Sequence, residues 1–317
     1  MDWFGVALDG PLVVIRALHF AATAMTTGTL IFRAVVAGSA APAAKSVAMI
    51  VRVQTLRVVW IYLAICVASG LIWFLLEAAS MSGLSLEEST TSDVLLTVAN
   101  ETQFGRMAEI RCLLAAILAG CLALDGFAPV RGCAVAISLA LIAAIAWTGH
   151  AGSTVGELGI LHLAADAFHL VAAAAWIGGL ASLVLLLSVA MRDQTHAGVS
   201  FARDATQRFS TMGIAIVVTV FATGLVNTWI LVGSLQALVA TGYGQLVMLK
   251  VALFAAMLSF AAANRFWLTP RLALSSASKI AVQRRLVRNS TIEIALALMI
   301  LAIVGVLGTL QPAIQAA

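Results

Sequence analysis

The run HLAADAFHLVAAAAWIGGLASLVLLLSVA, residues 162–190, decides the fold class of this chain. It is 29 residues long and carries one formal charge, on Asp166. About 20 predominantly apolar residues suffice to cross a bilayer as a helix, so the run predicts a transmembrane helix. Its first turns nevertheless hold His162, Asp166 and His169. Ionisable groups are costly in a membrane segment, so we expect this helix to carry a functional site.

The rest of the chain is equally apolar. Of 317 residues, 62% are hydrophobic and 10% are charged, with a mean hydropathy of +1.06, which excludes an ordinary soluble domain. The runs are continuously apolar rather than alternating, so they predict helices and exclude a β-barrel. Eight segments are long enough to span a membrane: 12–36, 50–76, 107–124, 132–148, 160–190, 209–232, 245–263 and 291–311.

Basic residues predict how these helices cross the membrane. The loops after the first, third, fifth and seventh segments hold 14 of the 18 Lys and Arg residues, whereas the opposite loops carry acidic residues such as Glu87 and Glu157. By the positive-inside rule both termini face the outside, which is the periplasm for a bacterial inner membrane. The net charge of +4 therefore reflects topology. We expect membrane lipid around the chain and no nucleic-acid partner.

The chain contains an internal repeat. His19 precedes Gly28 by nine residues, as His169 precedes Gly178. Further markers recur in order, namely Ser69-Gly70-Leu71 with Thr223-Gly224-Leu225, and Phe104-Gly105 before Arg111 with Tyr243-Gly244 before Lys250. Four helices per half make such a repeat parallel. We therefore predict an all-α integral membrane protein with eight transmembrane helices in two parallel four-helix halves, residues 1–148 and 149–317.

The candidate site combines residues from several segments. His162, Asp166 and His169 share one helix face at positions i, i+4 and i+7, His150 lies one short loop away, and His19 is the repeat counterpart of His169. Imidazole is the commonest protein ligand for copper, zinc, iron and nickel, and a carboxylate can ligate or orient it. Spacing alone does not separate a metal ion from haem, and each histidine could instead be a hydrogen-bonded packing residue.

Other polar residues in the apolar segments have two interpretations each. Arg111 and Lys250 either snorkel to the surface or neutralise a buried carboxylate or an anionic cofactor. Asn227 should hydrogen-bond to another helix, and Glu293 is interpreted as a charge at the inner surface. His196 lies in a charged loop and is not expected to be a ligand.

Several absences narrow the function further. The four cysteines, Cys66, Cys112, Cys121 and Cys133, lack a CxxC spacing and lie in apolar segments, so we expect buried small hydrophobes rather than disulfides or a zinc site. The chain has no Walker A motif, no nucleophile elbow and no GxGxxG after a strand. We therefore expect neither an ATP-driven pump nor an enzyme.

The second half of the chain resembles the CopD family of bacterial inner-membrane copper proteins. The resemblance covers about residues 147–312, while the first four helices match by length, His19 and the repeat. It rests on the following motifs: Gly149-His150-Ala151, His169 with Trp176-Ile177-Gly178-Gly179, Arg208-Phe209-Ser210, Thr223-Gly224-Leu225-Val226-Asn227, Tyr243-Gly244-Gln245-Leu246 with Lys250, Ala262-Ala263-Asn264-Arg265, and Arg288 with Glu293 and Pro312.

This resemblance implies copper binding and transport, usually uptake, across the inner membrane, with a CopC-like periplasmic copper carrier as partner. The expected copper ligands are His19, His150, His162, Asp166 and His169. The family is also thought to be distantly related to haem-binding four-helix membrane proteins, so the alternative is a redox protein in which His19 and His169 bind haem b. A third possibility is a scaffold that docks the carrier without transporting copper.

Overall fold

The computed structural model describes residues 10–38, 42–193, 195–272 and 276–316, and this part of the chain is helical with no strand. Seven of its helices are long and apolar enough to cross a membrane. They are α1 (Gly10–Val35), α2 (Lys45–Ser82), α6 (Ala128–Ala143, continued by η3, Ala144–Thr148), α8 (Gly156–Asp193), α9 (His196–Val232), α11 (Gly242–Ala263) and α13 (Ser276–Leu307). The prediction of an all-α membrane protein is confirmed at this level.

The predicted third segment also forms a helix, α5 (Gln103–Ala123), but it is not among these seven. Its first half carries Arg106, Glu109 and Arg111, which lower its apolar character. It packs against α2 and α6. The remaining elements are short: η2 (Pro42–Ala44), α3 (Leu86–Ser89), α4 (Ser92–Glu101), α7 (His150–Ser153), α10 (Leu235–Ala240), η4 (Asn264–Leu268), α12 (Thr269–Arg271) and α14 (Ala313–Ala316).

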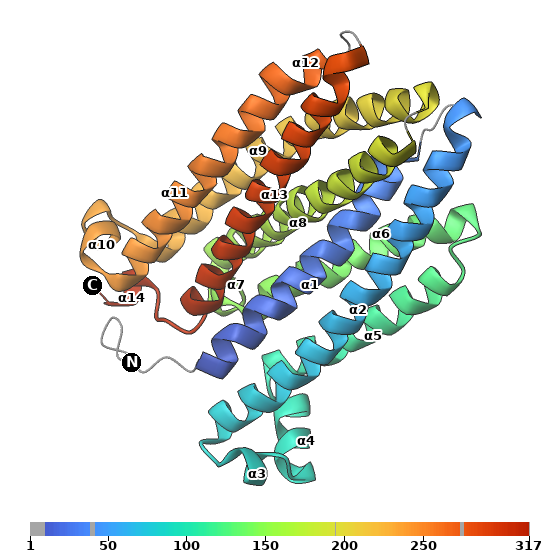
Figure 1. Ribbon diagram of the computed structural model, residues 1–317. Coiled ribbons are helices and arrows are strands. Elements are labelled where there is room, and N and C mark those ends of the chain that lie inside the picture. The colour runs from blue at the N-terminus through green and yellow to red at the C-terminus, as the bar shows by residue number, and fades with distance from the viewer. Residues whose placement is uncertain (1–9, 39–41, 194, 273–275, 317) are drawn as a thin grey trace.

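Helices α1 and α8 lie side by side in the middle of the bundle, with α2, α5 and α6 on one side and α9, α11 and α13 on the other (Figure 1). Their backbones touch where two glycines meet. A Cβ on Gly28 would stand 1.9 Å from the Ala174 carbonyl oxygen, and a Cβ on Gly178 would stand 2.7 Å from Gly28 Cα. Only glycine permits this approach, as in other small-residue seams between membrane helices.

Threonine caps start α5 and α11 in the same way. The Thr102 hydroxyl accepts a hydrogen bond from the Gly105 N–H at 2.9 Å, and Thr241 does so for Gly244 at 3.0 Å. Both glycines also abut the short helix before them, because an added Cβ would lie 2.1 Å from the Val98 carbonyl oxygen and 2.3 Å from that of Leu238. The caps satisfy N–H groups at the helix start that have no partner within the helix.

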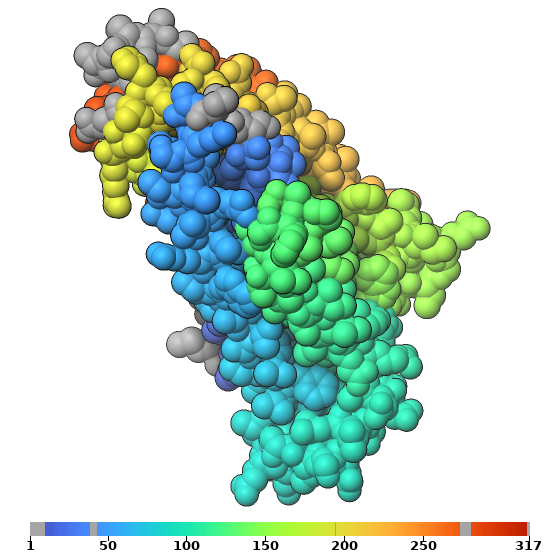
Figure 2. Space-filling view, turned by 90° about the vertical axis from the view of Figure 1, so that its right-hand side faces the viewer, coloured from blue at the N-terminus to red at the C-terminus, as the bar shows by residue number. Residues whose placement is uncertain are grey.

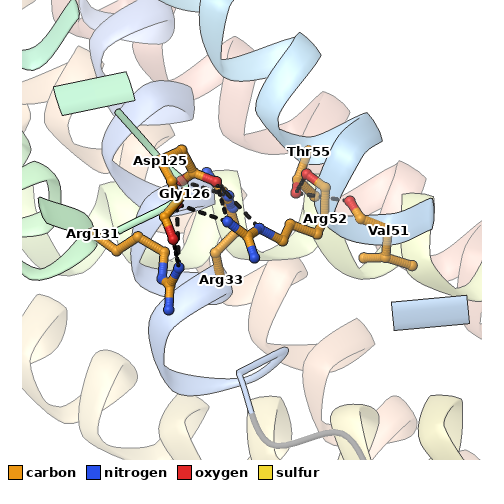
Figure 3. Close-up of polar contacts among 7 residues, drawn as sticks. All are labelled: Arg33, Val51, Arg52, Thr55, Asp125, Gly126 and Arg131. Atoms are coloured by element: carbon orange, nitrogen blue, oxygen red, sulfur yellow. Dashed lines mark hydrogen bonds and ion pairs between the residues drawn. The ribbon is translucent and has the colours of Figure 1, made fainter. Parts of the chain in front are cut away.

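One end of the bundle is closed by a cluster of arginines around Asp125, which lies between α5 and α6 (Figure 3). Arg33 from α1 and Arg52 from α2 each pair with its carboxylate at 2.9 Å. Arg131 from α6 donates to the Asp125 backbone carbonyl at 3.2 Å. The carboxylate therefore joins α1 to α2, and the backbone carbonyl of the same residue adds α6.

At the opposite end, α1 begins and α13 ends close together (Figure 1). The same end carries α3 and α4, which form the lower tip of the molecule below α2 and α5 (Figure 2). Short helices α7 and α10 also lie at this end, so the histidine-bearing start of α8 is far from the Asp125 cluster (Figure 1).

Candidate functional site

The central residue of the candidate site is His169, about one turn after Asp166 in α8. Its Nδ1 lies 2.9 Å from the Thr223 hydroxyl of α9. That hydroxyl donates its own proton to the Thr219 carbonyl at 2.6 Å, so Thr223 Oγ1 accepts and His169 Nδ1 carries the hydrogen. The lone pair of His169 is then on Nε2. A ring held in this way is a typical metal-ligand imidazole, with its other nitrogen oriented by a neighbour.

Asp166 lies beside a cationic and an amide side chain. Asn227 of α9 donates to its Oδ1 at 3.1 Å, which confirms the predicted hydrogen bond from Asn227 to another helix. Lys250 of α11 is close enough to attract the carboxylate, and Tyr243 is near as well. The two side chains form no ion pair within 4.0 Å, so the role of Lys250 as a counter-charge for Asp166 stays a prediction. The Asn227 Oδ1 is buried and has no hydrogen-bond partner in the described part of the chain.

His150 and His162 form a second pair nearer the end of the bundle. His162 is 1% exposed, and its Nδ1 lies 2.8 Å from the Thr154 hydroxyl. His150, outside the spanning segments, donates from Nε2 to the Leu307 carbonyl at 3.2 Å and packs edge-on against Tyr243. Burial lowers the pKa of His150, so its imidazole is neutral near pH 7 and its Nδ1 lone pair is available.

The N-terminal half holds a related arrangement around His19. His19 Nδ1 donates to the Cys66 carbonyl of α2 at 3.0 Å and lies 3.2 Å from the Ser69 hydroxyl. A carbonyl only accepts, so the lone pair is again on Nε2, which is buried and has no hydrogen-bond partner among the described residues. Ser69 occupies the position that Thr223 has beside His169. A Cβ on Gly70 would stand 3.2 Å from the His19 ring, and one on Gly224 would stand 3.5 Å from the His169 ring.

The surroundings of the two histidines differ in charge. Arg16 precedes His19 by three residues, where Asp166 precedes His169, and Trp73 follows Ser69 by four, where Asn227 follows Thr223. The guanidinium groups of Arg16 and Arg111 lie 5.3 and 4.7 Å from the Trp73 ring centroid. Arg111 is 5% exposed, so it packs inside the helix bundle and does not snorkel to the surface. The polar pattern of the sequence alone does not single out Arg16 or Trp73, although the repeat pairs them with Asp166 and Asn227.

The five expected ligands do not converge on one point. Within the described residues, no group of three His, Cys, Asp or Glu side chains is placed to hold a metal ion. His19 hydrogen-bonds to α2 and His169 to α9, so the two lie in separate helix pairs. Their roles as copper ligands stay predictions.

Two other expectations need correction. Glu293 is not a surface charge. It is 1% exposed and accepts hydrogen bonds from Trp176 Nε1 at 3.3 Å and Asn264 Nδ2 at 2.8 Å. Of the cysteines only Cys66 is buried, because Cys112 and Cys133 lie on outward faces of α5 and α6, which a hydrophobic segment alone does not reveal.

Together the helices and the ionisable groups inside them define a polytopic membrane protein with intramembrane polar sites. The sequence matches two family profiles, "Copper resistance protein D-like, N-terminal domain" over residues 7–160 and "Copper resistance protein D" over residues 203–307. The chain belongs to the copper resistance protein D family. It is a multi-pass protein of the bacterial inner membrane.

Three relatives are similar over part of their length. Copper resistance protein D of Pseudomonas syringae pv. tomato is 31% identical over 55% of this chain and 57% of its own length. Inner membrane protein YebZ of Escherichia coli is 32% identical over 53% of this chain and 55% of its own. Copper transport protein CutJ of Bacillus subtilis is 36% identical over 37% of this chain and 21% of its own. The matched region thus spans about half of the first two relatives. No solved structure matches the chain.

Proposed function

We propose that this protein binds copper and carries it across the inner membrane, in the direction of import, rather than catalysing a reaction. The observation that carries the proposal is His169, whose Nδ1 is fixed by Thr223 and whose Nε2 is left as a ligand atom within a membrane helix. The relative named as a copper transport protein supports transport for this chain as well.

The proposed route begins with the residues around α8. His150 and His162 receive copper near the end of the bundle, and His169, Asp166 and Asn227 hold it deeper in the membrane. Side-chain rotation would be needed to bring three ligands onto copper, because no three of them lie together among the described residues. Such a loose site suits a cargo that must also leave. His19 would add a contact from α1. A CopC-like periplasmic carrier would deliver the copper.

Helix packing supports the finer topology that we propose. The bundle has eight long helices when α5 is counted, and α1 begins at the end where α13 finishes (Figure 1). An even number of crossings and the distribution of basic residues support a topology with both termini in the periplasm. The glycine contact between α1 and α8, the paired histidine environments and the paired threonine caps support two parallel repeats.

Copper content of the purified protein tests the assignment. Wild-type protein loaded with copper should retain it after gel filtration, whereas the double variant His162→Ala, His169→Ala should lose high-affinity binding. His196→Ala, at the start of α9 and distant in sequence from the cluster, is the matched control and should bind as wild type does. Unchanged binding in the double variant would remove both histidines from the site.

Two further measurements separate the alternatives. A Soret band that follows the purified protein would favour haem b held by His19 and His169, while a colourless protein would reject it. Copper accumulation in right-side-out vesicles, measured with and without the protein, distinguishes a transporter from a scaffold that only docks the carrier. Accumulation inside the vesicles also establishes the direction of import.

A further inference from the structure

A cavity of about 490 Å³ lies in the C-terminal half, between α8, α9, α11 with η4, and α13. Apolar side chains of Leu180, Phe209, Val217 and Leu258 make up much of its lining. Its charged lining residues are Glu293 and Arg265. The cavity is separate from the histidine cluster, because its nearest α8 residue, Trp176, lies two turns beyond His169, about 10 Å along the helix.

An aromatic pair stands between the two regions. The rings of Trp176 and Phe254 pack edge to face with centroids 5.8 Å apart. Phe254 follows Lys250 by one turn of α11, and Leu258 of the cavity follows by another. The C-terminal half therefore contains two polar regions in series along the helices, first Asp166 with Lys250 and then Glu293.

Among the residues that the structure describes, Glu293 forms no ion pair. Within the described residues the ion pairs involve Asp125 and Asp204. Arg265 donates from Nη1 to the carbonyl and the hydroxyl of Ser210, and Arg208 of α9 donates to the Val36 carbonyl. On α13 the nearest cation, Arg288, has an exposed side chain. Neither α8 nor α11 adds another charged group to the cavity lining.

The neighbours of Glu293 are suited to a carboxyl group and not to a bound cation. Trp176 and Asn264 both direct N–H groups at its two oxygens, and Asn264 in turn accepts from Asn289 through its own Oδ1 at 2.9 Å. A sodium or metal ion would need oxygen atoms directed at it. Asn264 begins the π-helical turn η4, just before Pro270, and such turns often occur at functional sites.

Asn289 connects this cluster to a second cavity of about 220 Å³. That cavity is lined by Arg271, Arg285 and Arg288 as well as Asn289, and it lies towards the end of the bundle opposite the histidine cluster. The polar side chains thus run from the buried carboxyl group to a basic opening that can admit water.

We propose that Glu293 is a proton-binding site inside the membrane, which takes up and releases a proton through the cavities next to Asn264 and Asn289. A buried carboxylate without a counter-ion is stabilised by binding a proton, and the two N–H donors keep its charged form accessible. Use of this proton to drive copper movement rests on the proposed function; proton binding itself does not.

Labelling with dicyclohexylcarbodiimide tests the site on copper-free purified protein. This reagent modifies protonated carboxyl groups in apolar surroundings, and peptide mass spectrometry locates the product. We expect labelling of Glu293 that declines as the pH is raised, none in Glu293→Gln, and none at Asp125, which is paired with two arginines. Absence of Glu293 labelling at every pH, or labelling that does not depend on pH, would overturn the proposal.

Trp176→Phe tests the same site without removing the carboxyl group. It deletes the N–H that stabilises the charged form, so the midpoint of labelling should move upward by about one pH unit. An unchanged or lower midpoint would contradict the role of the indole. The copper content of both variants, measured in parallel, shows separately whether the copper proposal holds.

A third measurement tests whether copper uptake is coupled to proton binding at Glu293. In proteoliposomes, copper uptake by the wild type should respond to an imposed pH gradient, and Glu293→Gln should bind copper normally but lose that response. Uptake that ignores the gradient in the wild type would reject coupling, whereas loss of copper binding in the wild type would reject the proposed function.

Discussion

His19 and His169 are held in the same tautomer by carbonyl and hydroxyl groups of the neighbouring helix. The Cys66 carbonyl accepts the Nδ1 hydrogen of His19, and the Thr223 hydroxyl accepts that of His169 because its own proton goes to Thr219. Each ring keeps a lone pair on Nε2. The charges nearby differ, however, since Arg16 stands where Asp166 does in the second half. The surroundings of His19 are therefore more positive than those of His169, where Asp166 offsets the charge of Lys250.

Thr223→Val should weaken copper binding. The change keeps the shape of the side chain but removes the hydroxyl acceptor for His169 Nδ1, and loss of such an orienting partner typically costs 10–100-fold in metal affinity. Copper titration of the purified variant measures the loss of affinity. Thr228→Val is the control, since Thr228 donates within its own helix to the Gly224 carbonyl. Equal affinities for the two variants would contradict the orienting role.

Asp166 and Lys250 should be energetically coupled. Removing either one, by Asp166→Asn or Lys250→Met, leaves the other charge inside the membrane and should cost roughly 3 kcal/mol of unfolding free energy. The double variant should cost less than the sum of the two, by at least about 1 kcal/mol. Unfolding in mixed micelles with increasing denaturing detergent gives the four values, and additive effects would show that the pair does not interact.

At the scale of elements, the α1–α8 crossing is the main constraint on packing. Gly28 and Gly178 bring the two backbones together, and the helices of each half pack outward from this seam. The Asp125 cluster then fixes α1, α2 and α6 at one end (Figure 3). Close backbone contact and a shared carboxylate thus replace the hydrophobic effect, which does not drive association between helices in lipid.

Gly28→Ala should be strongly destabilising. Its new Cβ would lie 1.9 Å from a backbone oxygen of α8, so the helices must separate, at a cost of at least about 2 kcal/mol. Gly120→Ala on α5 meets nothing within 4 Å and should be neutral or stabilising by up to about 1 kcal/mol. Unfolding in increasing denaturing detergent measures the unfolding free energy of both variants. Similar stabilities would show that α1 and α8 adjust freely at the seam.

Asp125→Asn should also destabilise, because it leaves Arg33 and Arg52 without their acceptor, at a cost of roughly 3 kcal/mol. Asp204→Asn is matched to it, since the Arg203–Asp204 pair is 45% and 42% exposed and should change stability by no more than about 0.5 kcal/mol. The same unfolding assay measures the loss of stability in each variant. A small effect at Asp125 would show that the cluster contributes little to helix association.

At the scale of the whole molecule, the two halves pack around one seam but differ inside. The N-terminal half buries arginines around Trp73, whereas the C-terminal half holds a carboxylate, a lysine and two cavities. We infer that the C-terminal half performs the ion chemistry. The α3–α4 projection extends the N-terminal half at the end where we expect the periplasm (Figure 2).

Reporter fusions test this orientation. Alkaline phosphatase joined after Ala317 should be active, because it folds only in the periplasm. Green fluorescent protein joined after Arg192 should fluoresce, because that loop is expected in the cytoplasm. The reverse pattern would invert the topology. An inactive phosphatase together with a fluorescent fusion would put both fusion points in the cytoplasm and contradict the three crossings expected between them, α9, α11 and α13.

The sequence by itself determined the helical membrane class and the approximate location of the long helices, and it predicted a site around His169. Apolar length and the cost of buried charge are local properties, so they can be read from one segment at a time. It could not determine that Glu293 is buried, that Arg111 packs on Trp73, or that His19 and His169 face different helices. Those facts depend on which helix lies against which, so only the tertiary structure decided them, by packing helices that are distant in sequence against one another.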